Sequence, residues 1–577
     1  MENAEIAAVL ADIADLLEIK GENAFRVRSY RNAALAIDSL PVKVSTIVAA
    51  GARRLEEIPG VGRGIAEKIV ELVTTGGLAY LDALEREIPR GLIEVLRVQG
   101  MGPKKTALVF RELGVRGLDD LEAAARAGKL RALAGMGEKT EQKVLRSIAQ
   151  LRRMSGRHRL AVVMAVASEL VAYLRGCEGV GRVEAAGSLR RLRDTVGDLD
   201  VLVSARHGEP LMERFVAWEA VREVLAKGAT RTSVILRNGL QVDVRVVDDG
   251  SFGAALQYFT GSKAHNVALR ERAVRMGLKI SEYGVFDAGD GRRIAGADEA
   301  GVYGAVGLPW IPPELRENLG EIEAAEKGEL PAPLEVGDIA GDLHCHTTAS
   351  DGSATIEEMA GAAMDLGYEY LAVTDHSQAV SIAHGLDEKR LARHMEAVDD
   401  VNAALSRRGS SFKLLKGAEV DIRADGSLDY GPAALKGLDC VVAAVHSAFN
   451  MPGREMTARI VRALSTGLVH ILAHPTGRLL TMREPYDLDM EEITASCRKY
   501  DVALELNCSP ERLDLSDTHL RLARSRGVPV VISTDAHAPQ HLSNITLGVR
   551  YARRGWIEKK HVLNSRNLKQ LMKFLRR

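Results

Sequence analysis

Short aliphatic runs in residues 341–577 repeatedly end in a histidine, aspartate or glutamate, and they alternate with stretches that read as helices. LAVTDH ends at His376, for example, and ILAH ends at His474. Alternating buried strands and helices predict a parallel barrel, in which the carboxyl ends of the strands meet at one rim. The polar residues at these ends should therefore lie together. This pattern restricts the last part of the chain to an α/β barrel with a functional site at one end.

The polar residues at the predicted rim are of types that bind metal ions. Only His158, His207 and His265 of the 15 histidines precede residue 341, so histidine is concentrated in the barrel. A buried imidazole or carboxylate needs a partner, and a bound metal ion supplies one. Mixed nitrogen and oxygen ligation suits Zn²⁺, Mn²⁺ or Fe²⁺ better than Ca²⁺. The predicted ligands are His344, His346, Asp351, His376, Glu419, His446, His474, Asp535 and His537.

A second set of carboxylates lies on predicted strands in the middle of the chain. Asp198 and Asp200 are two residues apart with aliphatic neighbours, which places both side chains on one face of a strand. Residues 240–246 (LQVDVRV) alternate in the same way and add Asp243. Three carboxylates on a rigid sheet suit two Mg²⁺ ions and phosphoryl transfer. The upstream GSLRR, residues 187–191, has the hydroxyl, backbone N–H and guanidinium groups that hold phosphates.

Three glycine turns recur in the first 155 residues, at 58–62 (IPGVG), 98–102 (VQGMG) and 133–137 (LAGMG). Glycine permits positive φ and exposes backbone N–H groups at a helix start, where a phosphate oxygen can bind. One copy alone would be an ordinary helix turn. Three copies followed by basic residues resemble the helix-hairpin-helix motif, which grips the DNA backbone without reading sequence. The predicted DNA-binding residues are Gly60, Gly62, Gly100, Gly102, Lys104, Lys105, Gly135, Gly137 and Lys139.

Composition argues against several classes of protein. At 577 residues the chain is long enough for three or more domains, which excludes a single small binding module. No apolar run reaches the roughly 18 residues that span a bilayer, and the start shows no signal-peptide pattern, so we expect a cytoplasmic protein without membrane contact. The five cysteines form no CxxC pair, which argues against a disulfide framework. The net charge of −1 is a sum over the whole chain, in which basic residues follow the glycine turns of the first part and some of the acidic residues are predicted metal ligands.

Residues 5–320 resemble the family X DNA polymerases, whose core is that of DNA polymerase β. The likeness rests on IPGVGRGIAEKI (58–69), GSLRR followed by DLD at the family's spacing, the VDVR strand and YFTGS (258–262). It implies that Asp198 and Asp200 bind two Mg²⁺ or Mn²⁺ ions, and that Asp243 binds the catalytic ion and activates the primer 3′-OH. One difference is Gln241, where the vertebrate enzyme has an arginine oriented on the third aspartate. The implied nucleotide-binding residues are Ser188, Arg191 and Gly197 at the triphosphate, Tyr258 and Phe259 at the sugar with Gly261 beside them, Asn266 at the base edge and Arg270 on the template side.

The amino-terminal region resembles the eight-kilodalton domain of the same family. There the lysine of the AEK triplet forms a Schiff base with the abasic sugar during removal of 5′-deoxyribose phosphate, and Lys68 occupies that place. This reaction requires a neutral amine, because only the unprotonated nitrogen is nucleophilic. The alternative is a solvated helix lysine that contacts DNA phosphate. Lys68 is therefore a candidate catalytic residue with two open roles.

Residues 341–577 resemble the polymerase and histidinol phosphatase (PHP) domain. Residues that can bind metal occupy all nine ligand places of that family, which implies an active site for up to three divalent ions. Clustered divalent ions form a bridging hydroxide and hydrolyse phosphoesters. The resemblance implies one ion at His344, His346, Glu419 and Asp535, a second at Glu419, His446 and His474, and a third at Asp351, His376 and His537.

Together these patterns predict a multidomain chain with α+β and α/β parts. A helical helix-hairpin-helix region would precede a nucleotidyltransferase-type palm and thumb and a distorted (β/α)7 PHP barrel. The predicted segments are an eight-kilodalton-like domain at 1–80, a fingers-type helical domain at 81–155, the palm at 156–250, the thumb at 251–325, a linker at 326–340 and the PHP domain at 341–577.

The predicted function is that of a repair polymerase that adds dNTPs in short gaps, coupled to a PHP 3′–5′ exonuclease. AP endonuclease and 3′-phosphatase activities, and roles in base excision repair or end joining, are further expectations. The expected partners are gapped or nicked DNA, dNTPs and other repair proteins, and the chain is expected to be a monomer. Two alternatives stay open: a PHP half that is a small-molecule phosphatase, and a DNA-end-binding scaffold with one silent site.

Overall fold

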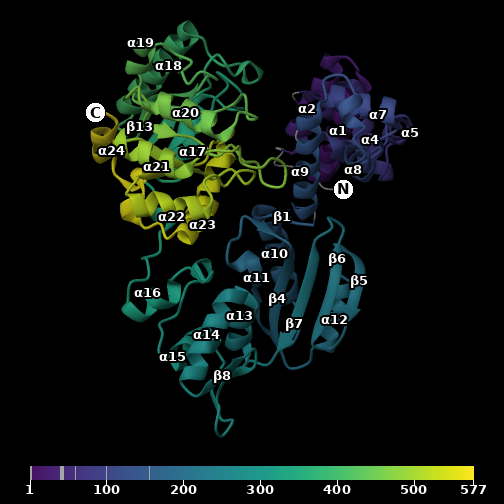
Figure 1. Cartoon of the computed structure of the whole chain (residues 1–577), viewed down its shortest axis with the longest axis vertical. Helices are drawn as coiled ribbons and strands as arrows, with labels where there is room; N and C mark the ends of the chain where they lie inside the picture. Colours follow the sequence, from purple (N-terminus) through teal and green to yellow (C-terminus); the bar gives the residue numbers. More distant parts are fainter. Residues whose placement is uncertain (1–2, 39–43, 59, 99, 155, 577) are drawn as a thin grey trace. The chain divides into compact units, whose positions relative to one another are not determined.

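The computed structural model describes residues 3–38, 44–58, 60–98, 100–154 and 156–576. Pro59 and Gln99, inside two of the predicted glycine turns, lie outside the described residues. The chain forms two compact units, Met1–Ser155 and Gly156–Arg577, and Figure 1 labels many of their elements. In the described residues, no helix is both long enough and apolar enough to span a membrane. The finer division into six predicted segments stays a prediction.

The first unit is helical, as the sequence predicts. Gly60, Gly100 and Gly135 adopt positive φ angles of 84°, 94° and 74°. Gly62 and Gly102 are the N-caps of α4 (Arg63–Thr75) and α7 (Pro103–Leu113), and Gly137 directly precedes α9 (Glu138–Met154). Each turn therefore starts a helix whose first N–H groups have no partner within the helix. The other elements are α1 (Asn3–Lys20), α2 (Ala24–Asp38), α3 (Val44–Ala50), η1 (Ala52–Glu57), α5 (Ala79–Glu87), α6 (Gly91–Leu96), α8 (Leu118–Arg126) and η2 (Leu130–Ala132).

A five-stranded sheet carries the predicted aspartates. Its strands, in spatial order, are β2 (Val180–Ala185), β4 (Asp198–Ala205), β7 (Gln241–Val247), β6 (Arg231–Leu236) and β5 (Val221–Lys227). Strand β4 runs parallel to β7, and the other neighbours are antiparallel. Burial alternates at the start of β4, because successive side chains point to opposite faces of the sheet. The remaining elements of this part are β1 (His158–Arg159), α10 (Leu160–Arg175), α11 (Gly187–Arg190), β3 (Thr195–Val196) and α12 (Glu209–Val216).

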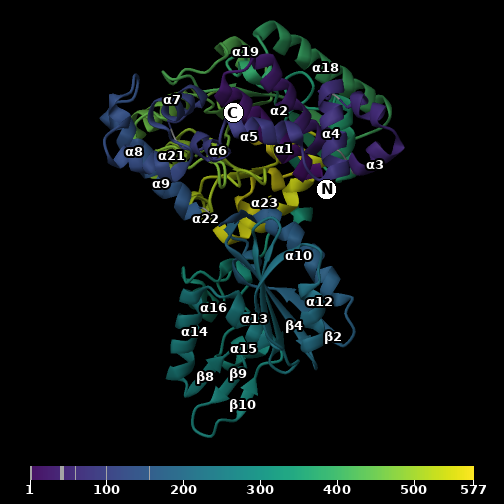
Figure 2. The ribbon, with the colours of Figure 1, turned by 90° about the vertical axis from the view of Figure 1, so that its right-hand side faces the viewer.

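The segment after the sheet has its own small core. Helices α13 (Phe252–Thr260), α14 (Lys263–Arg275) and α15 (Glu299–Ala305) adjoin a small antiparallel sheet of β8 (Leu278–Ser281), β9 (Gly284–Asp287) and β10 (Arg293–Ala295). Figure 2 shows these strands side by side. The chain continues through η3 (Pro313–Leu315), α16 (Glu321–Lys327) and η4 (Val336–Asp338). The predicted extended linker at 326–340 thus includes the end of one helix and a 3-10 turn.

The last part forms the predicted parallel barrel, and the barrel is nearly closed. Seven parallel strands follow one another in chain order. Beyond the last strand, Ala536 pairs with Cys345, and Thr534 donates to the Asp342 carboxylate, so the two edge strands approach each other. The strands are β11 (Gly341–Cys345), β12 (Tyr370–Val373), β13 (Lys413–Asp421), β14 (Cys440–Ala444), β15 (Ile471–Leu472), β16 (Ala503–Asn507) and β17 (Val530–Ser533).

Helices surround the barrel, and their apolar residues pack against its aliphatic strands. Met359 of α17 and Ile460 of α20, for example, are fully buried in the same core as Val373 and Leu504. The aliphatic residues within the strands form this core, and the polar residues follow at the carboxyl ends of the strands. The helices are α17 (Ile356–Asp365), α18 (Glu388–Arg407), α19 (Pro432–Lys436), α20 (Gly453–Leu464), α21 (Met490–Lys499), α22 (Asp517–Arg526), α23 (Ile545–Ala552) and α24 (Leu568–Leu575), and the 3-10 turns are η5 (Ser381–Ala383), η6 (Pro539–Asn544), η7 (Arg553–Gly555), η8 (Lys559–His561) and η9 (Leu563–Ser565).

Candidate active sites

The predicted aspartates meet on the palm sheet. The parallel register of β4 and β7 places Asp200 opposite Asp243, and Asp198 opposite Gln241. Asp243 is buried, whereas Asp198 is exposed at the start of its strand. Burial, together with the charges of Asp198 and Asp243, raises the pKa of Asp200 to about 6. Like-charged carboxylates held this close favour a bound cation, which lowers their mutual repulsion.

The third aspartate has neighbours that the sequence did not indicate. Ser233 on the adjacent strand β6 donates its hydroxyl to Asp243 Oδ1. Arg231, from the same strand, places Nη2 3.4 Å from that oxygen. Gln241 donates its amide to Asp243 Oδ2 at 3.2 Å. The guanidinium that is missing at position 241 is thus supplied by a neighbouring strand, and only the strand pairing could have revealed it.

The predicted phosphate loop lies beside these carboxylates. Gly187 has a φ of 63°, and a Cβ there would lie 2.7 Å from Asp200 Oδ2, so a larger residue would clash with this carboxylate. Ser188 follows in the short helix α11 and is half-buried. Arg191 is mostly buried: its Nε donates to Glu317 at 3.0 Å and its Nη1 donates to the carbonyl of Thr260. Gly197 lies between β3 and β4.

The predicted nucleotide-contact residues of the next segment occupy α13 and α14. The rings of Tyr258 and Phe259 meet edge to face with centroids 5.1 Å apart, and Gly261 ends their helix. Asn266 is buried: its amide donates to the carbonyl of Tyr258 at 2.7 Å and its oxygen accepts from Gln257 at 2.8 Å. Its side chain therefore faces α13 in this conformation. The exposed Arg270 follows one turn later on α14.

Lys68 lies on α4, one turn after the first glycine turn. Its amine donates to the carbonyl of Gly64 at 3.0 Å and lies 4.8 Å from the centre of the Tyr80 ring. Arg26 donates to the hydroxyl of the same tyrosine. The aromatic ring and the nearby guanidinium form a defined setting for the lysine, and both roles predicted for Lys68 stay predictions.

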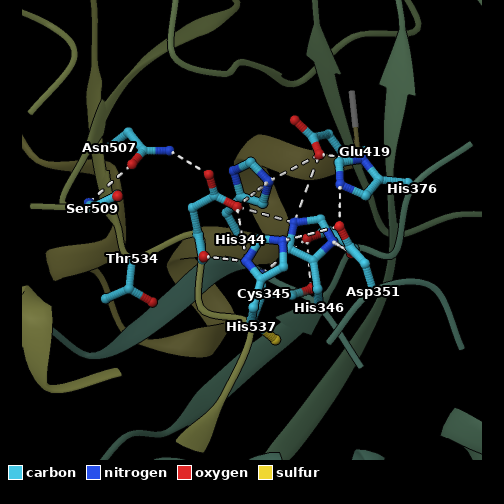
Figure 3. Close-up of polar contacts among 12 residues, drawn as sticks. His344, Cys345, His346, Asp351, His376, Glu419, Asn507, Ser509, Thr534 and His537 are labelled. Carbon is cyan, nitrogen blue, oxygen red and sulfur yellow. Dashed lines mark hydrogen bonds and ion pairs between the residues drawn. The ribbon is translucent and has the colours of Figure 1, made fainter. Parts of the chain in front are cut away.

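The barrel brings its nine predicted ligands to one rim. Glu419 lies near the end of β13, and the others follow the strand ends or occupy the loop after β11. Figure 3 shows His344, His346, His376, His537 and Glu419 pointing toward one another. His474 and Asp535 have positive φ angles of 28° and 52°, an uncommon backbone conformation that clusters at functional sites.

Glu419 is the centre of this cluster. One of its oxygens lies 2.7 Å from His376 Nδ1, 3.5 Å from His344 Nε2 and 3.6 Å from His346 Nε2. The other lies 2.8 Å from His474 Nε2 and 3.2 Å from His446 Nε2. A single buried carboxylate thus faces five imidazoles, which is the arrangement expected of a residue that bridges two ions.

The remaining ligands complete two further groups. Asp535 Oδ1 is 3.1 Å from His346 Nε2 and 3.6 Å from His344 Nε2. Asp351 is 3.4 Å from His537 Nε2 and 3.5 Å from His376 Nε2. Compact potential metal-binding groups are therefore His344 with His346 and Asp535, His346 with Asp351, His376 and His537, and His376 with Glu419 and His446.

This grouping shares His346 and His376 between neighbours, which differs from the division that the family resemblance implies. The residue set is the same, and the assignment of each ligand to one ion stays a prediction.

The chemistry of the cluster fits divalent metal ions. Among the described residues, His344 Nε2 and His346 Nδ1 are buried without a hydrogen-bond partner, although carboxylate oxygens of Glu419 and Asp351 lie 3.5 Å and 3.8 Å from them. Burial alone would raise the pKa of Glu419, but His376, His446 and His344 hold it well below its usual value. An ionised carboxylate with unpartnered imidazole nitrogens around it is a donor set for metal.

Further carboxylates orient the ligands, and sequence reasoning missed them. Glu505 lies 2.7 Å from His344 Nδ1 and accepts the backbone N–H of His474 at 2.6 Å. Asp421 accepts the backbone N–H of His446 at 3.0 Å. The only available signal was a polar residue inside an otherwise aliphatic strand, as in ALELN at 503–507. Such supporting contacts fix the tautomer and direction of a ligating histidine.

Four family profiles match the chain. They are the helix-hairpin-helix domain at 1–78, the SAM-like helix-hairpin-helix tandem at 92–150, the DNA polymerase beta thumb at 255–317 and the PHP domain at 342–509. The PHP match ends before Asp535 and His537, but the barrel places these two residues beside the other predicted ligands.

Individual relatives cover different parts of the chain. The DNA polymerase/3'-5' exonuclease PolX of Bacillus subtilis is 39% identical over 580 residues, which covers 100% of both chains. DNA polymerase lambda of Rattus norvegicus is 27% identical over 55% of this chain and 56% of its own length. A probable phosphatase of Shewanella oneidensis is 27% identical over 34% of this chain and 75% of its own length.

A palm sheet with three convergent carboxylates, joined to a barrel with a metal-ligand rim, defines a nucleotidyltransferase fused to a metal-dependent phosphoesterase. The full-length likeness to PolX makes the assignment more specific. This chain belongs to the bacterial family X DNA polymerases that carry a C-terminal PHP domain. It is an enzyme with a polymerase half and a phosphoesterase half.

Proposed function

We propose that this enzyme fills short gaps in DNA by template-directed addition of dNTPs, and that its PHP domain trims DNA from 3′ to 5′. The observation that carries the proposal is the presence of two clusters of potential metal ligands in one chain: Asp200 opposite Asp243, and the histidines and carboxylates around Glu419. The helix-hairpin-helix matches at 1–78 and 92–150 add a surface of the kind that grips DNA. A scaffold with one silent site would not need both centres to be intact.

In the polymerase half, Asp198, Asp200 and Asp243 would hold Mg²⁺ or Mn²⁺. These ions supply charge neutralisation for the triphosphate and lower the pKa of the primer hydroxyl. Ser233 and Gln241 fix the direction of Asp243 through hydrogen bonds to both of its oxygens. Gly187 keeps the space beside Asp200 open, and Arg191 would bind the triphosphate.

In the PHP half, the nine rim residues would hold up to three ions of Zn²⁺, Mn²⁺ or Fe²⁺. Such ions supply a hydroxide and stabilise negative charge on a phosphodiester. Arg512 has its Nε 3.6 Å from Asp535 Oδ2, so a guanidinium lies at the edge of the ligand cluster. The positive charge of Arg512 suits a DNA phosphate next to the one that is cleaved. AP endonuclease and 3′-phosphatase activities would use the same centre.

A labelled duplex with a one-nucleotide gap tests the proposal directly. Asp198→Ala should abolish extension and leave trimming, whereas His344→Ala should abolish trimming and leave extension. Asp365→Ala and His207→Ala, at exposed positions, serve as matched controls. Wild-type protein that neither extends nor trims this duplex with Mg²⁺ or Mn²⁺ would contradict the proposal.

The probable phosphatase among the relatives favours a second reading of the PHP half as a phosphomonoesterase. Hydrolysis of a small phosphomonoester such as p-nitrophenyl phosphate at a kcat/KM above that for a DNA 3′ end would favour this second function.

For Lys68, borohydride trapping on a 5′-deoxyribose phosphate end distinguishes the two roles. Loss of the trapped adduct in Lys68→Ala, but not in Lys129→Ala at an exposed position outside the predicted DNA-binding set, would support the lyase. Equal trapping in both variants would support a phosphate contact. We further propose that the enzyme acts as a cytoplasmic monomer together with other repair proteins.

A further inference from the structure

The segment after α23 connects the PHP half to the polymerase half. Trp556 is buried in the same apolar cluster as Leu315 and Ile322, which belong to the segment before the barrel. Arg553 lies 3.5 Å from Glu314. The backbone between these two anchors is therefore held against the end of the predicted thumb.

Arg554 lies between these two anchors and is almost fully buried. Its Nη2 lies 2.5 Å from Asp517 Oδ2, and Asp517 begins α22 of the barrel. Its Nη1 lies 3.1 Å from Glu317 Oε1 and also donates to the backbone carbonyl of Arg191. Burial alone would lower the pKa of Arg554, but the charges of Asp517 and Glu317 more than offset this effect. One guanidinium of the PHP half thus reaches the phosphate loop of the polymerase half.

Glu317 links that guanidinium to Arg191. The same oxygen, Oε1, accepts from Arg191 Nε at 3.0 Å and from Arg554 Nη1 at 3.1 Å. The carbonyl of Thr260 accepts from Arg191 Nη1. Within the described parts of the chain, acceptors are thus supplied to Nε and Nη1 of Arg191, and Nη2 is left to meet a ligand.

The charge of Arg554 affects how strongly this network attracts a triphosphate. Without Arg554, the charge of Glu317 would be compensated by Arg191 alone, so Arg191 would offer less positive charge to a polyanionic triphosphate and binding would weaken. Arg193, 3.9 Å from Asp517, belongs to the same network. The three arginines Arg191, Arg193 and Arg554 face two carboxylates, so the network keeps a net positive charge at the phosphate loop.

We propose that Arg554 of the PHP half is a positioning residue for the polymerase site. Together with Glu317 it fixes Arg191 for the triphosphate of the incoming nucleotide, and it neutralises Glu317 there. This inference rests on the proposed polymerase function and adds a requirement for the PHP half in dNTP binding. It does not involve the PHP metal site.

The test measures KM and kcat for a dNTP on a one-nucleotide gap with the full chain. Arg554→Met should raise the KM for dNTP about tenfold, the usual effect of losing one charge-assisted hydrogen bond, with kcat within about twofold. Arg554→Lys should recover part of this loss, because lysine restores the charge but not the planar fork. Trimming by the PHP half should not change. Arg550→Met, on the preceding helix α23, is the matched control.

A double variant separates positioning from general damage. In Glu317→Gln the carboxylate charge is gone, so adding Arg554→Met should then raise KM by less than about threefold. Equal KM values for wild type and Arg554→Met would overturn the inference, and so would a parallel fall of extension and trimming together with a lower Tm. Failure of the proposed function is distinguishable, because wild-type protein would then incorporate no dNTP at all.

Discussion

His344 Nδ1 lies 2.7 Å from the carboxylate of Glu505, and both side chains are buried beneath the metal-ligand rim of the barrel. The contact turns His344 so that its Nε2 faces Glu419 and Asp535 at 3.5 and 3.6 Å. Burial alone would raise the pKa of Glu505, but the charge of His344 more than offsets it, so this carboxylate stays ionised. Glu505 therefore orients the predicted ligand His344 and is not itself one of the predicted metal ligands.

Glu505→Gln should weaken metal binding at the rim by about 10- to 100-fold, as removal of such supporting partners usually does. The amide keeps the volume of the side chain but loses the charge that holds the Nδ1 proton. Titration of metal-free protein with Mn²⁺ or Zn²⁺, read by calorimetry and by trimming activity, measures the change. Glu455→Gln, an exposed site on α20, is the control. Unchanged affinity in Glu505→Gln would show that the contact is only structural.

Removal of the metal should lower the Tm of the C-terminal half. Without ions, buried atoms such as His344 Nε2 and His346 Nδ1 lack hydrogen-bond partners among the described residues. A ligand present at about 100 times its Kd stabilises by about 2.7 kcal/mol, which corresponds to roughly 5–10 °C for a domain of this size. Calorimetry before and after chelation and dialysis checks this. The shift should be smaller in His474→Ala, and a Tm that does not respond to chelation in wild type would contradict a bound metal.

The sequence predicted the barrel and the polar residues that meet at its rim because those features are local. An aliphatic run followed by a histidine, as at His376 or His474, carries both the strand and the ligand in a few residues. The same holds for Asp198 and Asp200, whose spacing alone places them on one face. These parts of the fold and site therefore needed no knowledge of tertiary contacts.

Contacts between distant segments could not be predicted in this way. Glu505 is 161 residues from His344, and Arg554 is 237 residues from Glu317. The run ALELN at 503–507 shows a polar residue in an aliphatic strand but not which histidine Glu505 contacts, and nothing in the residues around Arg554 distinguishes it from other charged residues. The hydrogen bonds of Asn266 with Tyr258 and Gln257 of α13 could not be predicted either, and its contact with a base edge stays a prediction.

Ser233→Ala should lower the kcat of nucleotide addition about tenfold with little change in the KM for dNTP. Ser233 donates to Asp243 Oδ1, and loss of this bond leaves a buried carboxylate oxygen less well oriented, at a cost of about 1–1.5 kcal/mol. Single-turnover extension of a gapped primer isolates the chemical step. Ser168→Ala, exposed on α10, should behave as wild type. A fall in dNTP affinity with an unchanged chemical step would refute this role of Ser233.

Glu299 should contribute stability that depends on pH. It is almost fully buried and is held by Arg190 at 2.8 Å and Arg316 at 2.6 Å. Burial alone would raise the pKa of Glu299, but these two guanidinium groups lower it to about 2 from an ordinary value of 4.5. A carboxyl with a lowered folded-state pKa stabilises the protein above its unfolded-state pKa, and the effect is lost as the pH falls through the folded-state value. The lowering of the Glu299 pKa corresponds to about 3 kcal/mol in the free energy of unfolding.

Glu299→Gln should therefore lower the Tm of the second unit at pH 6 to 8, and the difference from wild type should shrink steadily from pH 4.5 toward pH 2. Thermal unfolding of both proteins across this range gives the comparison, with Glu271→Gln at an exposed site of α14 as the control. Only the difference between wild type and variant is informative, because other carboxyl groups also titrate at low pH and affect both proteins alike. A difference in Tm that stays constant from pH 7 to pH 3 would assign the effect to lost packing, and not to the charge of Glu299 between its two arginines.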